Sequence, residues 1–89
     1  MAIEVDPKKD ARNKGKHGIA LTRFEEMDFE TALSAVDEAH STPDETRWTF
    51  VGWIEGRLFS GIVTYRGMQT RVISLRPASR KERKLYAET

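Results

Sequence analysis

The sequence predicts an α+β fold. It has an antiparallel sheet, made of a three-strand meander plus one or two N-terminal strands, packed with two N-terminal helices and a C-terminal helix. Residues 47–76 contain runs rich in β-branched and aromatic residues, separated by short turns with glycine, which is the pattern of consecutive hairpins. Helix start signals precede this segment at Asp6-Pro7 and follow it at Ser79. A chain of 89 residues provides for one core, so residues 1–89 are expected to form a single domain.

The N-terminal segment begins with a short strand and continues as a helix. Ile3 and Val5 alternate with polar neighbours, as in an edge strand. Asp6 is a good N-cap, and a proline after it is favourable at the first helical position. The spacing therefore predicts a helix over residues 7–16, with the small apolar Ala11 as its contact with the sheet.

A glycine and a capping pattern mark where the first helix ends and the second begins. Gly18 is expected to end the first helix as a left-handed cap. A second short helix is predicted over residues 21–28, where Thr22 and Glu25 have the spacing of a capping box.

The strongest signals in the chain are three strands joined by tight turns. Gly56 and Gly67 suit those turns, and connections this short force neighbouring strands to run antiparallel. Alternation in the first strand places Trp48, Phe50 and Ile54 on one side. The predicted strands cover residues 47–54, 57–65 and 69–76.

A weak strand, a loop and a last helix complete the prediction. Residues 31–36 form a modest strand, and the acidic residues 37–46 form an exposed loop. Ser79 and Glu82 have capping-box spacing and open a last helix over residues 79–88. All helices are expected on one face of the sheet. One face of the last helix is expected to consist of Ala78, Glu82, Leu85 and Tyr86.

The net charge of +1 hides an asymmetry along the chain. Residues 18–46 contain one arginine and eight carboxylates, whereas residues 65–84 contain seven Lys or Arg and one Glu. A basic segment rich in arginine suits a phosphate-bearing partner, although solvated faces that keep the protein soluble explain such runs equally well. The cations expected to bind RNA are Arg66, Arg71, Arg80, Arg83 and Lys84.

The composition also excludes several classes of protein. The chain has no cysteine and only two histidines, which excludes a disulfide framework and thiolate metal sites, and no cofactor or metal is expected. No apolar run approaches the length of a membrane span, and the charged N-terminus lacks a signal-peptide core. A cytoplasmic protein with no membrane contact is therefore expected.

Two segments resemble the signatures of a known family. Asp6-Pro7-Lys8, Asn13 and Lys16-His17-Gly18-Ile19 resemble the opening of the BrnT toxins of bacterial type II toxin–antitoxin systems. The end of the chain resembles their closing signature, in Ile73-Ser74-Leu75-Arg76-Pro77-Ala78-Ser79, Glu82-Arg83 and Tyr86. Val5 and Ala20 depart from the family pattern, where a tryptophan and a polar cap are usual.

The resemblance implies a RelE-like fold and a ribonuclease that inhibits translation. It also implies a ribbon-helix-helix, BrnA-like antitoxin as the partner that neutralises the toxin and binds DNA, so that this chain meets DNA only indirectly. RNA would be the substrate.

Metal-free cleavage of RNA requires groups that this chain can supply. The 2′-hydroxyl must lose a proton, charge on the phosphorane must be stabilised, and the leaving oxygen must gain a proton. Arg76, at the end of the last strand, is the first choice for charge stabilisation, and the alternative is an ion pair with a helix carboxylate. Alternation is expected to put Arg76 on the same side as Ser74 and Val72, with Arg71 on the opposite face.

Four further residues are candidates for catalysis, each with a structural alternative. His17 is a candidate acid or base because it is a histidine, but it also suits a helix C-terminus. Lys16 either binds phosphate or is solvated. Glu82 is a general base or only the capping residue, and Tyr86 is catalytic or part of the core. His40 is expected to be exposed and idle.

Three functions remain open from the sequence. The first is an endoribonuclease toxin. The second is a catalytically inactive RNA- or protein-binding domain of the same fold. The third is a subunit that acts mainly as co-repressor with its antitoxin. An exposed apolar patch around Trp53 would suit a protein partner.

Overall fold

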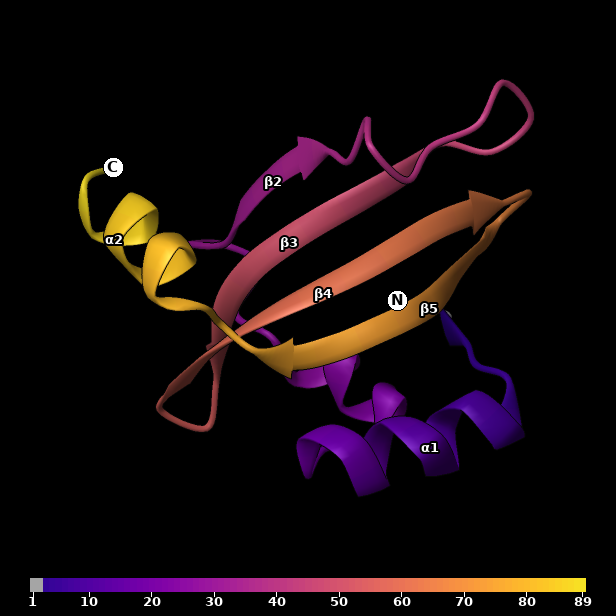
Figure 1. Cartoon of the computed structure of the whole chain (residues 1–89), viewed down its shortest axis with the longest axis horizontal. Helices are drawn as coiled ribbons and strands as arrows, with labels where there is room; N and C mark the ends of the chain where they lie inside the picture. Colours follow the sequence, from indigo (N-terminus) through magenta and orange to yellow (C-terminus); the bar gives the residue numbers. More distant parts are fainter. Residues whose placement is uncertain (1–2) are drawn as a thin grey trace.

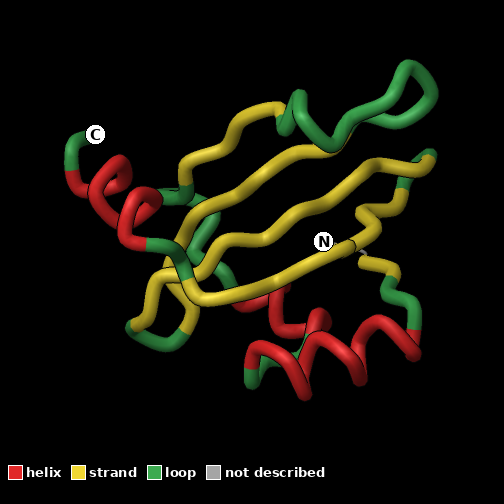
Figure 2. Tube along the Cα trace, in the orientation of Figure 1, coloured by secondary structure: helices red, strands yellow, loops and turns green. Residues whose placement is uncertain are grey.

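The computed structural model describes residues 3–89 and contains one sheet of five strands with helices on both of its faces (Figures 1 and 2). In chain order the elements are β1 (Ile3–Glu4), α1 (Pro7–His17), the 3-10 helix η1 (Leu21–Glu26), β2 (Leu33–Val36), β3 (Arg47–Ile54), β4 (Arg57–Arg66), β5 (Gln69–Pro77) and α2 (Arg80–Ala87). This order agrees with the predicted one. No helix of the described residues is long and apolar enough to cross a membrane.

The sheet is mixed, and its strand order is β1-β5-β4-β3-β2. The predicted meander is confirmed, because β3, β4 and β5 pair antiparallel through their tight turns. The prediction of a wholly antiparallel sheet is wrong, since β1 runs parallel to β5, with Ile3 opposite Thr70. No tight turn links β1 to the strand beside it, so nothing local in the sequence fixes their relative direction.

Helix α1 begins and ends as predicted, but a different residue joins it to the sheet. Asp6 caps its N-terminus by accepting the backbone N–H of Lys8 at 2.9 Å, and Gly18 ends it with φ of 75°. Ala11 is exposed, so the prediction that it contacts the sheet is wrong. The buried residue is Asn13, whose amide donates to the carbonyl oxygens of Leu75 and of the loop after α1.

The second helix is a short 3-10 helix that takes its cap from α1. Its N-cap is Ala20, which has no side chain able to accept a hydrogen bond, so the predicted Thr22–Glu25 capping box is wrong. Asp10 of α1 accepts the backbone N–H of Leu21 at 2.7 Å instead. One helix thus fixes the start of the next.

The main core lies between η1, α1 and one face of the sheet. Trp48, Phe50 and Ile54 lie against it, as alternation predicts. Phe24 packs so closely on Gly61 of β4 that a Cβ there would lie 2.8 Å from its ring, which is why a side chain is excluded at this point of the strand. The buried members of this core are Ile19, Leu21, Phe24, Met27, Ile54, Phe59, Val63, Val72 and Leu75.

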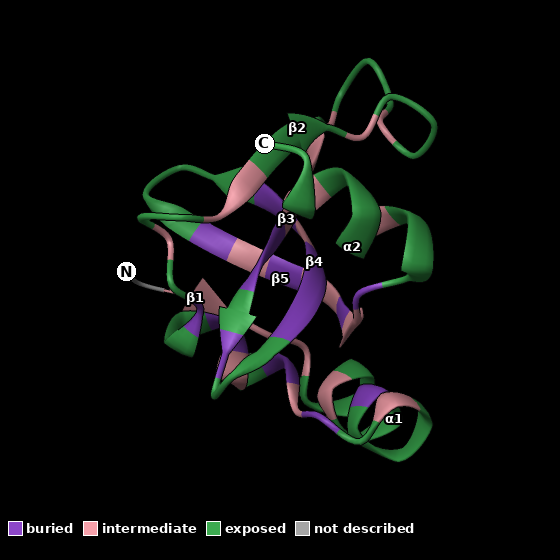
Figure 3. Ribbon diagram, turned by 90° about the vertical axis from the view of Figure 1, so that its left-hand side faces the viewer, coloured by how far each residue is buried: buried purple, intermediate pink, exposed green. Residues whose placement is uncertain are grey.

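Helix α2 lies on the opposite face of the sheet from α1, so the prediction of helices on one face is wrong (Figures 1 and 3). A second, smaller core of Val51, Leu58 and Ala78 packs there with Tyr86. Neighbours of these residues in β3 and β4, such as Phe59, point to the main core, as alternation requires. Leu85 is exposed, but with Glu82 it lines a hollow between α2 and the strands β2 and β3, so it lies on the sheet-facing side of α2 as predicted.

A β-bulge in β5 changes which side chains share a face. Val63 pairs with Val72 and Ile62 with Ser74, which leaves Ile73 as the extra residue. Val72 is therefore in the main core, whereas Ser74 and Arg76 face the side of α2. Arg71 shares that side, so the predicted grouping of Val72 with Arg76 and opposite Arg71 is wrong.

Candidate functional site

Arg76 forms a two-pronged ion pair with Glu82 at the junction of β5 and α2. Its Nη1 donates to Oε1 of Glu82 at 2.6 Å, and its Nη2 donates to Oε2 at 3.1 Å. The Arg76 side chain keeps 38% of its surface exposed, against 19% for Glu82. The guanidinium is thus oriented by the helix carboxylate and still accessible to a ligand.

Two groups besides Arg76 hold the Glu82 carboxylate. The backbone N–H of Ser79 donates to it at 2.8 Å, completing the predicted capping box, and the buried Ser60 of β4 donates its hydroxyl at 2.9 Å. Burial raises the pKa of Glu82, but the hydrogen bonds from Arg76, Ser79 and Ser60 together outweigh it and lower the pKa to about 2. At neutral pH Glu82 is a fixed anion, which suits positioning Arg76 better than accepting a proton.

Lys16 and His17 lie in the last turn of α1, beside a groove between this helix and β5. The groove has a volume of about 250 Å³, and Ile73 and Ser74 of the bulge form its opposite wall. His17 also lines a second hollow of about 200 Å³ next to the β3–β4 turn. Gly18 stops the helix at this point, so His17 stands where the two hollows meet. The residues lining the groove are Lys9, Arg12, Asn13, Lys16, His17, Ile73 and Ser74.

The groove and Arg76 are joined by one short stretch of β5. Ser74 lines the groove, and Arg76 follows two residues later on the same side of the strand. β1 pairs with β5 only at Thr70 and Arg71, and farther along the strand α1 reaches this edge through Asn13, which bonds both backbone groups of Leu75. An elongated ligand bound along this part of β5 would contact first the groove cations and then the Arg76 guanidinium.

Tyr86 lies on the inward side of α2, as predicted, but packs on an aromatic ring. Its ring meets that of Trp53 edge to face, with centroids 5.9 Å apart. Trp53 retains 41% exposure. The pair fastens α2 to the sheet and leaves part of the indole surface open.

The C-terminal cations predicted to bind RNA do not form one surface. Arg66 and Arg71 lie near the β4–β5 turn, whereas Arg80, Arg83 and Lys84 belong to α2 or its flank at the other end of β5 (Figure 1). Arg71 pairs with Glu4 at 2.6 Å. Arg83 donates to the carbonyl of Ala78 at 2.9 Å. The continuous basic run of the sequence is therefore divided by the fold.

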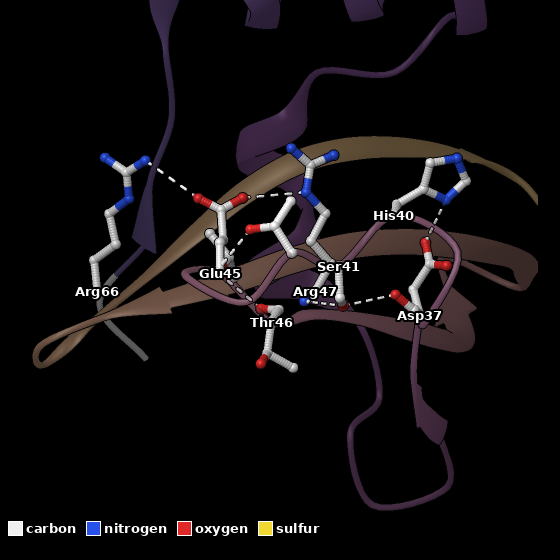
Figure 4. A network of polar contacts seen from close by, with 9 residues as sticks. Asp37, His40, Ser41, Glu45, Thr46, Arg47 and Arg66 are labelled. Atoms are coloured by element: carbon white, nitrogen blue, oxygen red, sulfur yellow. Dashed lines mark hydrogen bonds and ion pairs between the residues drawn. The ribbon is translucent and has the colours of Figure 1, made fainter.

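Arg66 belongs to a polar network around the loop before β3 (Figure 4). Glu45 accepts from Arg47 at 3.1 Å and lies 3.5 Å from Arg66. Hydrogen bonding from Arg47 lowers the pKa of Glu45, with a smaller contribution from Arg66. His40 is exposed, as predicted, and contacts Asp37 at 2.8 Å. This network stabilises the loop before β3 and engages Arg66 in an ion pair with Glu45.

Sequence reasoning missed the cations on the groove side of α1. Lys9 and Arg12 line the groove beside Lys16, and Asn13 forms its floor. The signal was present as spacing, because residues three and seven positions apart share one side of a helix. A search for apolar periodicity passes over it, since the side of α1 that meets the sheet is polar.

Metal ligands are not grouped in the described part of the chain. Residues 3–89 contain no cluster of three or more His, Asp or Glu side chains arranged to hold an ion. The titratable groups near the groove and near Arg76 are the ones described above.

Comparison with known proteins identifies the family. No curated protein matches the chain. A family model described as the ribonuclease toxin BrnT of type II toxin–antitoxin systems matches residues 6–82, which include both the groove and the Arg76–Glu82 pair. The chain therefore belongs to the BrnT family of ribonuclease toxins, whose partner is an antitoxin.

Proposed function

We propose that the chain is a metal-independent endoribonuclease that cleaves RNA by attack of a 2′-hydroxyl on the adjacent phosphate. The proposal is carried by one arrangement, in which Lys16 and His17 of α1 line a groove with Ser74 of β5, and Arg76 follows two residues later on that strand. The reaction needs a proton acceptor, a proton donor and a fixed cation; a histidine and an arginine lie there, and water can make the remaining proton transfer.

Each side chain has a separate role in this proposal. Arg76 stabilises charge on the phosphorane, and Glu82 with Ser60 holds its guanidinium in orientation. As the 2′-oxygen bonds to phosphorus, the bond from phosphorus to the 5′-oxygen breaks. His17 exchanges a proton with the 2′-hydroxyl or the leaving oxygen, water makes the other proton transfer, and Lys16 contributes charge beside it. Tyr86 is the least favoured catalytic candidate, since its ring is engaged with Trp53.

The same proposal extends to the biology of the protein. A single toxin domain with a RelE-like fold would inhibit translation by cutting RNA. A ribbon-helix-helix, BrnA-like antitoxin would neutralise it and carry the contact with DNA. Family membership supports these statements, and the basic flank of α2 offers a surface of suitable charge for an acidic antitoxin segment.

Cleavage of RNA by purified variants, with chelator present, tests the reaction. Arg76→Ala should lower the rate by about 10²–10³, because one charge-stabilising donor is removed. Arg76→Lys should restore only part of it, since an ammonium cannot make the two-pronged contact. Lys14→Ala, an exposed cation outside the groove, is the control and should cleave at the parent rate.

Two results would contradict the proposal. One is full activity of a folded Arg76→Ala protein, which would remove Arg76 from the chemistry. The other is cleavage that chelator abolishes and a divalent ion restores, which would overturn metal independence.

The alternative is a domain that binds RNA or protein without cleaving, or acts chiefly as co-repressor. It is favoured by the neutralisation of Arg76 by Glu82 and by the partly exposed Trp53. Retention of labelled RNA with no products from the parent protein would support this reading.

A further inference from the structure

The groove side of α1 carries a row of cations with helical spacing. Lys9, Arg12 and Lys16 are three and seven residues apart and all line the groove. At 1.5 Å per residue the row extends over about 10 Å. That is longer than a single phosphate group, so the row matches a chain of phosphates better than an isolated anion.

These three cations are not neutralised within the described part of the protein. None of them takes part in an ion pair among residues 3–89, and no carboxylate lines the groove. The Asp6 carboxylate at the start of α1 accepts backbone N–H groups and makes no ion pair with Lys9. Like charges on one helix face repel each other, and a concave wall of one sign concentrates the field that an anion meets.

Three arginines of the C-terminal half differ from the α1 row in that they form ion pairs. Arg66, Arg71 and Arg76 are each held by a carboxylate, from Glu45, Glu4 and Glu82. The α1 row has no such partner, although it contributes fewer charges to the sequence. Among residues 3–89, the cations of α2 (Arg80, Lys81, Arg83 and Lys84) also lack ion pairs, but they lie away from the groove, whose lining cations all come from α1.

The opposite wall of the groove suits a nucleotide chain. Ile73 of the bulge is half-buried and gives an apolar surface, and Ser74 beside it carries a hydroxyl. His17 stands at the end of the row, where the helix stops. We propose that single-stranded RNA binds with its backbone phosphates along Lys9, Arg12 and Lys16, which directs the chain toward His17 and the β5 edge. This inference rests on the proposed function and names where its substrate is held.

Binding of a short fluorescent oligoribonucleotide, measured by anisotropy at several salt concentrations, tests the site. All proteins carry Arg76→Ala so that RNA is not cut during the measurement. The groove variant is Lys9→Glu with Arg12→Glu. The matched control is Lys8→Glu with Lys14→Glu, which makes the same change in net charge on the exposed sides of the same helix.

The groove variant should bind on the order of tenfold more weakly at low salt, and the control should bind like its parent. Each lost phosphate contact lowers the slope of log K against log salt by about 0.7 for single strands, so two should lower it by about 1.4. A neutral pair, Lys9→Gln with Arg12→Gln, replaces the groove variant if the reversed one fails to fold, and should move both quantities in the same direction.

Two outcomes overturn the inference. Equal weakening in the groove variant and the control means that net charge alone attracts RNA. Unchanged binding in the groove variant means that RNA lies elsewhere. Failure of the proposed function is seen separately, as groove-dependent binding by a protein that, with Arg76 intact, leaves the RNA uncut.

Discussion

Asn13 joins α1 to the last strand through both backbone groups of one residue. Its Nδ2 donates to the Leu75 carbonyl at 2.7 Å, and its Oδ1 accepts the Leu75 N–H at 3.3 Å. The same amide donates to Ile19 O at 2.8 Å, which fixes the loop after the helix. Only an amide has a donor and an acceptor side by side to satisfy both groups of a strand edge.

Replacement of Asn13 should lower the free energy of unfolding by more than the loss of so small a side chain suggests. Asn13→Ala leaves the buried N–H and C=O of Leu75 without partners, so unfolding by denaturant should show a loss of about 2–3 kcal/mol. Asn13→Asp should be no better, because it lacks the donor and brings a carboxylate beside two carbonyl oxygens. Lys14→Ala, on the exposed side, should stay within about 0.5 kcal/mol of the parent. An equally small loss for Asn13→Ala would show that water replaces the amide.

Among the elements, α2 is attached to the sheet through a buried part of a titratable side chain, Glu82. Glu82 completes the cap of its own helix and also meets Arg76 of β5 and Ser60 of β4. One carboxylate thus joins the start of α2 to two strands. Trp53 and Tyr86 add the apolar part of the contact.

The stability conferred by Glu82 should disappear in acid. Its pKa is lowered from 4.5 to about 2 in the folded protein. A lowered pKa stabilises the fold above the unfolded value, and this contribution is lost as pH falls from 4.5 toward 2. The unfolding free energies of the parent and of Glu82→Gln should therefore differ by about 1–3 kcal/mol near neutral pH and converge near pH 2.

Thermal unfolding over that pH range measures the effect. Glu25→Gln removes an exposed carboxylate from η1 and serves as the matched control. A gap between the parent and Glu82→Gln that is constant with pH would mean that the loss arises from packing and not from the charge.

The elements predicted well from the sequence are those with local signals. The strand from Arg47 to Ile54 and the capped ends of both α-helices follow from alternation, tight turns and cap residues. The direction of β1 and the face chosen by α2 depend on partners far away in the chain, so no local pattern contains them. The bulge at Ile73 is a similar case, because one unpaired residue reverses the faces of all residues before it.

The candidate site divides in the same way. The Glu82 cap and the ion-pair alternative for Arg76 could be predicted from spacing, and both are present. For the Lys9–Arg12 side of the groove the sequence shows only a helical spacing, and that spacing marks a site only because β5 lies opposite. Charge totals along the sequence pointed to the C-terminal cations, whereas the fold pairs several of those with carboxylates.

Over the whole molecule, protection of backbone amides against exchange should be highest in the central strand of the sheet and lowest in its edge strands. β4 lies at the centre of the sheet between β3 and β5, whereas β1 is two residues long and β2 four. Native-state hydrogen exchange should therefore find the slowest amides in β4 and the fastest strand amides in β1 and β2, since short edge strands open without global unfolding. Protection of β1 equal to that of β4 would show that the N-terminal segment unfolds only with the entire sheet.

The hydrogen bonds of Asn13 to Leu75 also bear on aggregation of the protein. An unpaired strand edge is a template on which another chain can add a strand and start aggregation. On the β5 side, β1 covers Thr70 and Arg71, and the amide of Asn13 takes the backbone groups of Leu75 farther along. On the opposite side, β2 is short and leads into the acidic loop, where like charges oppose a second copy. Backbone pairing thus protects the β5 edge from self-association, and shortness and nearby negative charge protect the β2 edge. Loss of the Asn13 amide would leave the backbone groups of Leu75 free to pair with another chain.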